Sequence, residues 1–284
     1  MYEIVFKQQL NDSVYRLAVH APMVAAKAQP GQFVILRVDE QGERIPLTVA
    51  DYDPVAGTVT VIVQAVGATT LALSRLSVGD SLSDFVGPLG RPTDTDGLQK
   101  VAVVGGGVGS AIAYPVAKKL HSLGCEVHAI VGFRSKELVI LQEEFAAVSD
   151  RLELVTDDGS AGEKGLVTDV LRRLIDNGER YDRVIAIGPL PMMKFVSKLT
   201  MEYAIPTVVS MNPVMIDGTG MCGGCRLTVG GEMKFACVDG PEFDGHLVDF
   251  DEAMERSGMY REQERHAYEN TCNLFRKEGD SHAE

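Results

Sequence analysis

Three of the five cysteines in this 284-residue chain lie close together, at Cys222, Cys225 and Cys237, shortly after the tetrapeptide Asp217-Gly-Thr-Gly. Two thiolates separated by two residues can bind one iron, the glycines let the backbone fold around a charged centre, and a third thiolate can return across a hairpin. A plant-type C-x4-C-x2-C run would need a cysteine at position 217, where this chain has an aspartate. The spacing therefore predicts a [2Fe–2S] cluster with three sulfur ligands and one carboxylate ligand, Asp217.

Other interpretations of these residues stay open. A structural zinc also accepts three thiolates and a carboxylate. Asp217 can instead be an ordinary turn residue, because Asp-Gly favours a tight bend. A disulfide is disfavoured, since nothing in the sequence indicates an oxidising compartment. Cys125 and Cys272 lie far from the other three cysteines and are expected to be inert small residues.

Glycine-rich segments further upstream could bind phosphate. The run from Gly105 to Gly109 follows an apolar strand and opens a helix, so its free N–H groups and the positive end of the helix dipole could meet a pyrophosphate. A tight strand-to-helix turn is the alternative. The following strand ends at Phe133-Arg134 without the acidic residue of a standard Rossmann site. Gly188-Pro189 after a later strand offers a second glycine turn at the same sheet edge, or a plain loop.

The first hundred residues contain three shorter motifs. The segment from Arg44 to Thr48 combines a guanidinium suited to phosphate with a proline bend and a hydroxyl, although it could simply be an edge strand. Gly67 with Thr69 and Thr70 precedes an apolar helical run, so these residues could cap that helix or bind phosphate there. The segment Gly87-Pro-Leu-Gly90 is predicted to be a turn.

The elements that must position these motifs fall into two patterns. Short alternating or β-branched runs separated by turn residues indicate an antiparallel barrel, and continuous apolar runs from Val101 onward, alternating with amphipathic helices, indicate a doubly wound parallel sheet. The polar segment at 92–99 marks the boundary. The predicted domains are a β-barrel at 1–97, an α/β domain at 98–210, a cluster domain at 211–250 and a charged helical segment at 251–284.

Charge and hydropathy exclude several classes of function. The formal net charge of -13 argues against a nucleic-acid or membrane-surface partner. The N-terminus lacks a basic start with a long apolar run, and no apolar stretch approaches the roughly 18 residues of a membrane span. We expect a cytoplasmic protein.

The order of these motifs resembles the ferredoxin-reductase family, and within it the flavin subunits that carry a C-terminal [2Fe–2S] domain. The resemblance covers nearly the whole chain. It is strongest to the small subunits of the NADH-dependent reduced ferredoxin:NADP oxidoreductases, a group also labelled sulfide dehydrogenase, and it extends to the electron-transfer subunits of dihydroorotate dehydrogenase. The latter are expected to have four cysteines in the cluster motif, so Asp217 favours the former.

The resemblance implies two binding sites. FAD is expected to contact Arg44 near its pyrophosphate and Thr48 near its ring, with the full set Arg44, Pro46, Leu47, Thr48, Ile62, Val63, Gln64, Gly67, Thr69 and Thr70. The nicotinamide dinucleotide is expected at Gly105, Gly106, Gly107, Val108, Gly109, Phe133, Arg134, Asp157, Asp158, Gly188, Pro189 and Met192. The two aspartates would repel a 2′-phosphate, which favours NAD(H), while Arg134 leaves NADP(H) possible. No side chain is expected to act as an acid or base, because the cofactors carry the chemistry.

The resemblance also implies a partner. Electrons that leave the [2Fe–2S] cluster are expected to pass to a larger subunit with its own FAD and [4Fe–4S] clusters, and indirectly to ferredoxin, in a heterodimer that performs electron bifurcation. Three alternatives remain: the electron-transfer subunit of dihydroorotate dehydrogenase, a stand-alone NADPH-dependent sulfide or polysulfide oxidoreductase, and a zinc-stabilised nucleotide-binding regulator without redox activity.

Overall fold

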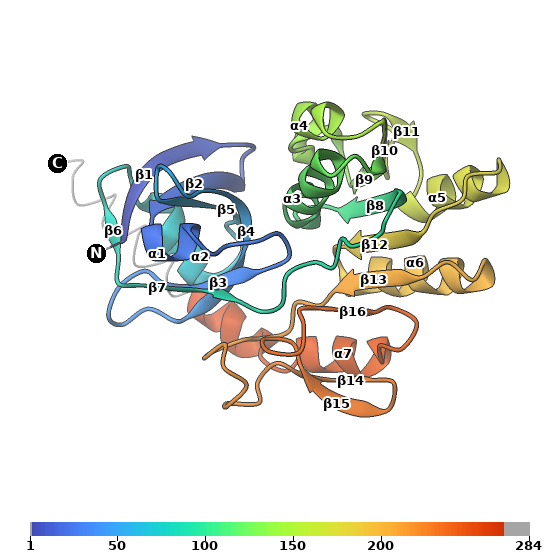
Figure 1. Cartoon of the computed structure of the whole chain (residues 1–284). Coiled ribbons are helices and arrows are strands. Elements are labelled where there is room, and N and C mark those ends of the chain that lie inside the picture. Colours follow the sequence, from blue (N-terminus) through green and yellow to red (C-terminus); the bar gives the residue numbers. More distant parts are fainter. Residues whose placement is uncertain (1, 270–284) are drawn as a thin grey trace.

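The computed structural model describes residues 2–269, and its N-terminal part is a nearly closed antiparallel barrel (Figure 1). Its strand order is β6-β1-β2-β5-β4-β3-β7. Alternation explains why these segments form strands: in β5, Val59, Val61 and Val63 are buried inside the barrel while the residues between them face outward. The strands are β1 (Tyr2–Gln9), β2 (Val14–His20), β3 (Phe33–Arg37), β4 (Ile45–Asp53), β5 (Thr58–Gln64), β6 (Ser81–Leu82) and β7 (Asp84–Leu89), with the helices α1 (Pro22–Ala25) and α2 (Ala68–Arg75).

One expectation for this region was wrong. The segment predicted as a turn at 87–90 instead forms the end of β7, in which Leu89 pairs with Phe33 of β3. The chain turns only at Gly90, whose φ is 74°. Proline and glycine are tolerated here because β7 is the last strand in the order of the sheet, so one of its edges needs no partner.

The second part is a parallel sheet with helices on both faces, as expected for a doubly wound fold. The helices α3 and α4 pack on one face, and α5 and α6 pack on the other. The strand order is β11-β10-β9-β8-β12-β13-β16, so the direction of winding reverses between β8 and β12. The elements are β8 (Lys100–Gly106), α3 (Gly109–Ser122), β9 (Glu126–Phe133), α4 (Gln142–Ala147), β10 (Arg151–Thr156), β11 (Glu163–Lys164), α5 (Val167–Asp176), β12 (Arg183–Ile187), α6 (Leu190–Glu202) and β13 (Thr207–Ser210).

The C-terminal part lies below the parallel sheet in Figure 1 and is joined to it. Its hairpin consists of β14 (Arg226–Val229) and β15 (Glu232–Phe235), and β16 (Glu242–Asp244) pairs antiparallel with β13. Helix α7 (Phe250–Ser257) follows, and the chain is helical again at 261–269. The rest of the predicted C-terminal helical segment, with Cys272, lies outside the described residues. Within the described part of the chain, no helix has the length and apolar character needed to cross a membrane.

A carboxyl group with a shifted pKa lies where the three parts meet. Glu242 in β16 accepts a hydrogen bond of 2.6 Å from the hydroxyl of Thr93, which belongs to the segment between the barrel and the parallel sheet. Burial raises the pKa of Glu242 to about 7, against the opposing effects of Thr93 and Arg183, and nearby Asp94 adds to the increase. Glu242 is therefore protonated more readily in the folded chain than in the unfolded chain.

We expect Glu242→Gln to stabilise the protein at pH 8. Because the pKa is higher in the folded state than in the unfolded state, the wild type loses stability as pH rises from about 4.5 to about 7, and glutamine removes this loss. The free energy of unfolding should rise by about 1–3 kcal/mol at pH 8 and by less at pH 5. Thermal unfolding curves recorded at the two pH values measure this difference. Glu3→Gln, at an exposed position in β1, is the control, and an equal gain at both pH values would contradict the prediction.

Candidate functional site

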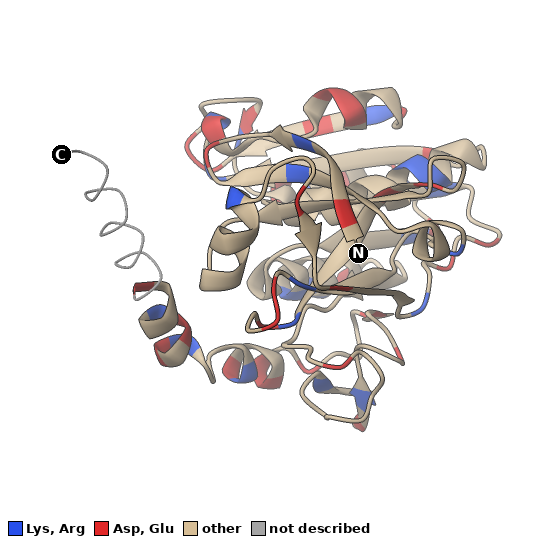
Figure 2. Cartoon of the chain, turned by 90° about the vertical axis from the view of Figure 1, so that its left-hand side faces the viewer, with Lys and Arg blue, Asp and Glu red and all other residues tan. Residues whose placement is uncertain are grey.

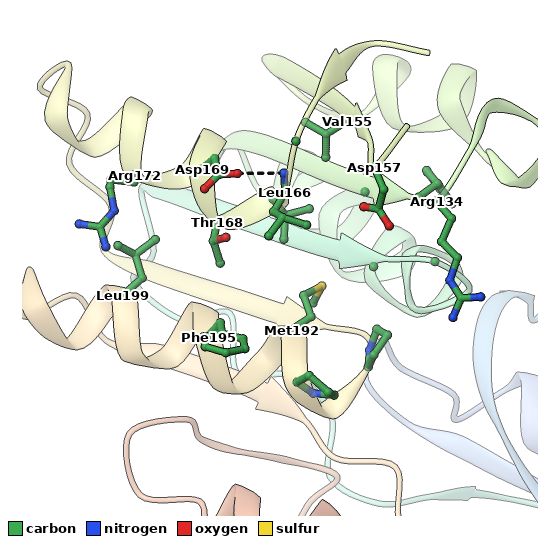
Figure 3. A pocket seen from close by; sticks show the side chains of 18 of the residues that line it. Arg134, Val155, Asp157, Leu166, Thr168, Asp169, Arg172, Met192, Phe195 and Leu199 are labelled. Atoms are coloured by element: carbon green, nitrogen blue, oxygen red, sulfur yellow. Dashed lines mark hydrogen bonds between the residues drawn. The ribbon is translucent and has the colours of Figure 1, made fainter. Parts of the chain in front are cut away.

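A cavity of about 620 Å³ opens at the carboxyl edge of the parallel sheet, between α5 and α6 (Figure 3). Strands β8, β9 and β10 contribute the residues at their ends, which is where open α/β sheets bind ligands. Figure 3 shows Arg134 at the end nearer the barrel, and Arg172 and Leu199 at the far end. The volume is within the range of small-molecule and cofactor sites.

Seven of the predicted dinucleotide residues line this cavity, and five do not. The lining residues from the predicted set are Gly106, Gly107, Phe133, Arg134, Asp157, Pro189 and Met192. Gly105, Val108, Gly109, Asp158 and Gly188 are not among the lining residues.

The turns after β8 and β12 pack against each other at the point where the winding direction reverses. A Cβ atom on Gly109 would lie 2.5 Å from the carbonyl oxygen of Ile187 and 2.6 Å from the Cα of Gly188, so no larger residue fits. Gly109 and Gly188 therefore hold the two turns together, and Gly107 and Pro189 are left facing the cavity.

The two adjacent aspartates have different roles. The carboxylate of Asp158 accepts hydrogen bonds from the Ser160 hydroxyl at 2.6 Å and from the Ser160 backbone N–H at 2.9 Å, which lower its pKa. Asp157 lines the cavity directly beside the end of β10. Only Asp157 is therefore placed to contact a ribose in this cavity.

Sequence reasoning missed most of the lining, including nearly all of the residues that α5 and α6 contribute. Asp169 accepts a hydrogen bond from the Leu166 N–H at 3.1 Å and so fixes the start of α5 at the cavity wall. At the far end, the guanidinium of Arg172 lies 3.2 Å from the carboxylate of Glu202. The helical period of 166–177 would have found the inner positions of α5. The missed residues are Gly132, Val155, Gly165, Leu166, Val167, Thr168, Asp169, Arg172, Pro191, Phe195, Lys198, Leu199 and Glu202.

The predicted flavin residues on β4 lie at an open edge of the barrel. Pro46, Leu47 and Thr48 pair with β3, whereas pairing between β4 and β5 begins only at Val49. The backbone of this segment is therefore unpaired on one side and can face a ligand. Arg44 just before it forms an ion pair of 3.2 Å with Asp84.

The remaining predicted flavin residues are divided between several environments. Thr70 caps α2, because its hydroxyl accepts from the Gly67 N–H at 2.9 Å, while the Thr69 hydroxyl donates to Glu43 at 3.2 Å. Val63 is buried in the barrel core, so its side chain cannot face a ligand outside the barrel. Ile62 packs on the outer face against the core of the α/β part, and Gln64 is half-buried at the end of β5.

The four predicted cluster ligands lie in one loop and hairpin, where Cys225 contacts Cys237 and Asp217 contacts Cys222. Cys225 and Cys237 are buried, with their sulfur atoms 3.3 Å apart, which is too far for a disulfide. Burial and the neighbouring Cys225 thiol raise the pKa of Cys237 to about 12. The carboxylate of Asp217 accepts hydrogen bonds from the Thr219 N–H at 2.9 Å and the Cys222 N–H at 2.8 Å, which lower its pKa. The loop thus gathers three thiols and a carboxylate, a donor set that fits a two-iron cluster.

The cluster loop packs directly on the barrel. Gly218 has a φ of 76°, and a Cβ on it would lie 2.6 Å from Leu89 and 2.9 Å from Ile35. Arg91, just after the barrel, donates to the carbonyl oxygens of Gly240 at 2.7 Å and of Val238 at 3.1 Å. The loop that carries the predicted iron ligands therefore contacts β3 and β7 directly, and β3 is the strand that pairs with β4.

The outer side of the same loop is exposed and apolar. Cys222 is exposed, unlike Cys225 and Cys237. Beside it, Met221 is 88% exposed and Ile216 is 53% exposed, and Val214 also faces outward. Exposed apolar residues gathered around one site are a common feature of protein-binding surfaces.

A second group of potential metal ligands is occupied by a lysine. Glu126, His128 and Glu179 have ligand atoms within 4.8 Å of one another. The ammonium of Lys100 lies 2.7 Å from Glu126 and 2.6 Å from Glu179, and it lowers the pKa of both carboxyl groups. This group is therefore an ion-pair network in which the cation is the protein's own.

Comparisons with known proteins agree with this arrangement. Residues 212–249 match the iron–sulfur cluster binding domain of dihydroorotate dehydrogenase B. The chain is 49% identical over 94% of its length to a dihydroorotate dehydrogenase B (NAD(+)) electron transfer subunit homolog from Thermotoga maritima, covering 94% of that protein. It is 33% identical over 84% of its length to the dihydroorotate dehydrogenase B (NAD(+)) electron transfer subunit from Geobacillus thermodenitrificans, covering 94% of that protein.

A solved structure is similar over almost the whole chain. Its description is "Insights into flavin-based electron bifurcation via the NADH-dependent reduced ferredoxin-NADP oxidoreductase structure". It is 47% identical to this chain with a TM-score of 0.90, and the match covers 95% of this chain and 97% of the other. An Amycolatopsis cytochrome P450 reductase also matches, at 20% identity and a TM-score of 0.61 over 72% of this chain and 66% of the other, which shows a shared fold.

The fold and these similarities define a ferredoxin-reductase-like oxidoreductase subunit with an FAD- and NAD(P)-binding fold and an iron–sulfur binding domain. The chain belongs to the family of electron-transfer subunits that includes those of dihydroorotate dehydrogenase B. The resemblance drawn from the sequence, the fold class, the oxidoreductase class and the expected cofactor types are thereby confirmed.

Proposed function

We propose that this chain is the NAD(H)-binding small subunit of an electron-bifurcating complex of the NADH-dependent reduced ferredoxin:NADP oxidoreductase type. The observation that carries the proposal is the 47% identity and TM-score of 0.90 to a structure described in those terms. FAD is assigned to the barrel at 1–97, the dinucleotide to 98–210 and a [2Fe–2S] cluster to 211–250. Bound FAD supplies two-electron exchange with a nicotinamide and one-electron exchange with an iron–sulfur centre.

The protein itself positions these groups and keeps them close together. Arg134 lines the cavity at the end nearer the barrel (Figure 3), so a dinucleotide bound there would direct one end toward the barrel. Gly218 brings the cluster loop against Ile35 and Leu89 on the neighbouring strands. Short separations between the bound groups are what sequential electron transfer requires.

The apolar outer side of the cluster loop is the proposed contact for the larger subunit. Met221 and Ile216 surround the exposed Cys222, so a partner that covers them would approach the cluster from outside. The segment after α7 offers a second contact, because it leads away from the body of the molecule (Figure 2) and exposes Met259 and Tyr260 in the turn before the helical stretch at 261–269. The partner is proposed to carry its own FAD and [4Fe–4S] clusters.

Asp217 is proposed as the fourth cluster ligand, and exchange for cysteine tests this. We expect Asp217→Cys to keep the iron content and to change the EPR g-values and the midpoint potential of the cluster, because a thiolate donates more electron density than a carboxylate. Glu232→Cys, on the exposed hairpin of the same domain, controls for an added thiol. An EPR spectrum and potential unchanged from the wild type would show that Asp217 only shapes the loop.

A second function is supported by the family match and by the names of several relatives, namely the electron-transfer subunit of a dihydroorotate dehydrogenase. Tagged protein purified without oxygen from its native host would separate the two. A co-purified FAD and [4Fe–4S] subunit with ferredoxin-dependent reduction of NADP supports the proposal. A co-purified subunit that oxidises dihydroorotate would replace it with the second function, and a colourless chain containing zinc would exclude both.

A further inference from the structure

The proposed flavin diphosphate site already contains two carboxylates. The hydroxyl of Thr69, at the start of α2, donates to Glu43 at 3.2 Å. Arg44 lies 3.2 Å from Asp84, and the same carboxylate oxygen lies 2.8 Å from the Nε of Arg37. The two guanidinium groups and these two carboxylates balance one another in formal charge before any ligand binds.

The two carboxylates have different partners. Asp84 is shared by Arg37 and Arg44, so it holds both cations in place and can keep one of them when Arg44 turns to a phosphate. Glu43 forms no ion pair with another described residue, and its side chain accepts a hydrogen bond from the Thr69 hydroxyl. An anion at the start of α2 would need that hydroxyl and would be repelled by the carboxylate.

We propose that Glu43 competes with the flavin diphosphate for Thr69 and the N-terminal end of α2. This inference rests on the proposed function, because it assumes that FAD binds at the barrel. When Glu43 leaves Thr69, the region gains a net positive charge from Arg37 and Arg44, which favours the diphosphate. Glu43 therefore lowers the affinity for FAD. Without a ligand, its negative charge balances the excess positive charge of Arg37 and Arg44 over Asp84.

Removal of the charge from Glu43 tests the inference in the full-length chain. After the flavin is removed under mild conditions, FAD is titrated back and its fluorescence quenching gives the dissociation constant. We expect Glu43→Gln to bind FAD about three- to tenfold more tightly than the wild type, with a smaller difference at high salt. Riboflavin, which lacks phosphate, should bind the two proteins equally.

Glu40→Gln is the matched control, because Glu40 is exposed in the same loop and loses the same charge. An unchanged or weaker affinity of Glu43→Gln for FAD would overturn the inference, as would an equal gain with riboflavin or with Glu40→Gln. Tight FAD binding by the wild type in those experiments would leave the proposed function standing. A wild-type chain that binds no FAD would overturn both.

Discussion

Cys237→Ser should yield a protein that contains FAD but no iron–sulfur cluster. The sulfur of Cys237 is buried and lies 3.3 Å from that of Cys225, so its loss removes one side of the proposed donor set, and serine is a poor ligand for iron of this type. Iron content and the EPR signal of the reduced protein should fall to background. Reduction of the flavin by NADH should continue, because no residue of the cluster loop lines the dinucleotide cavity.

Cys125→Ser is the matched control for this change. Cys125 is also buried, but it lies at the start of β9, in the core between that strand and α3, far from the loop that contains Asp217. Its serine variant should keep the full iron content. If Cys237→Ser retained two irons and an unaltered spectrum, the ligand would have to be another group, and the assignment of the loop would be wrong.

Asp157→Asn should abolish most of the preference for NADH over NADPH. A carboxylate that lines the cavity can accept hydrogen bonds from a ribose diol and repels a 2′-phosphate, and the amide does neither as strongly. We expect the ratio of kcat/KM for NADH to that for NADPH to fall on the order of 100-fold, measured as flavin reduction in the stopped flow.

Asp158→Asn separates the two aspartates. Because the carboxylate of Asp158 is engaged with Ser160, its replacement should leave the nucleotide ratio within about threefold of the wild type. The opposite pattern, with a large effect at 158 and none at 157, would show that the loop turns over when the dinucleotide binds. A wild type that prefers NADPH would contradict the choice of NAD(H) itself.

The sequence predicted the sheets better than it predicted the cavity. The apolar runs of β8 and β12 and the alternation in β5 are local patterns, and each became the expected strand. Which of two adjacent aspartates faces the cavity depends on Ser160, and the contribution of Phe195 depends on how α6 lies across the sheet. Both depend on the tertiary structure, and no local sequence pattern indicates them.

Two further contacts could not be predicted from the sequence for the same reason, because each joins segments that are far apart in the chain. The pairing of β16 with β13 joins segments separated by more than thirty residues, and the strand is only three residues long. The contact of Gly218 with Ile35 and Leu89 joins the cluster loop to barrel strands that lie more than a hundred residues earlier in the chain. The Asp-Gly dipeptide predicted a bend there, but it carried no information on what the bend touches.

The antiparallel pairing of β16 with β13 has a consequence for the modularity of the chain. Without β16, strand β13 would become the exposed border of the parallel sheet, with unpaired N–H and C=O groups that could recruit another chain. The iron–sulfur portion thus also serves as a protective cover for its neighbour. A version shortened before β16 should therefore aggregate instead of behaving as a simple flavin reductase. Any ancestral fusion of the two portions would have had to form the pairing between β13 and β16.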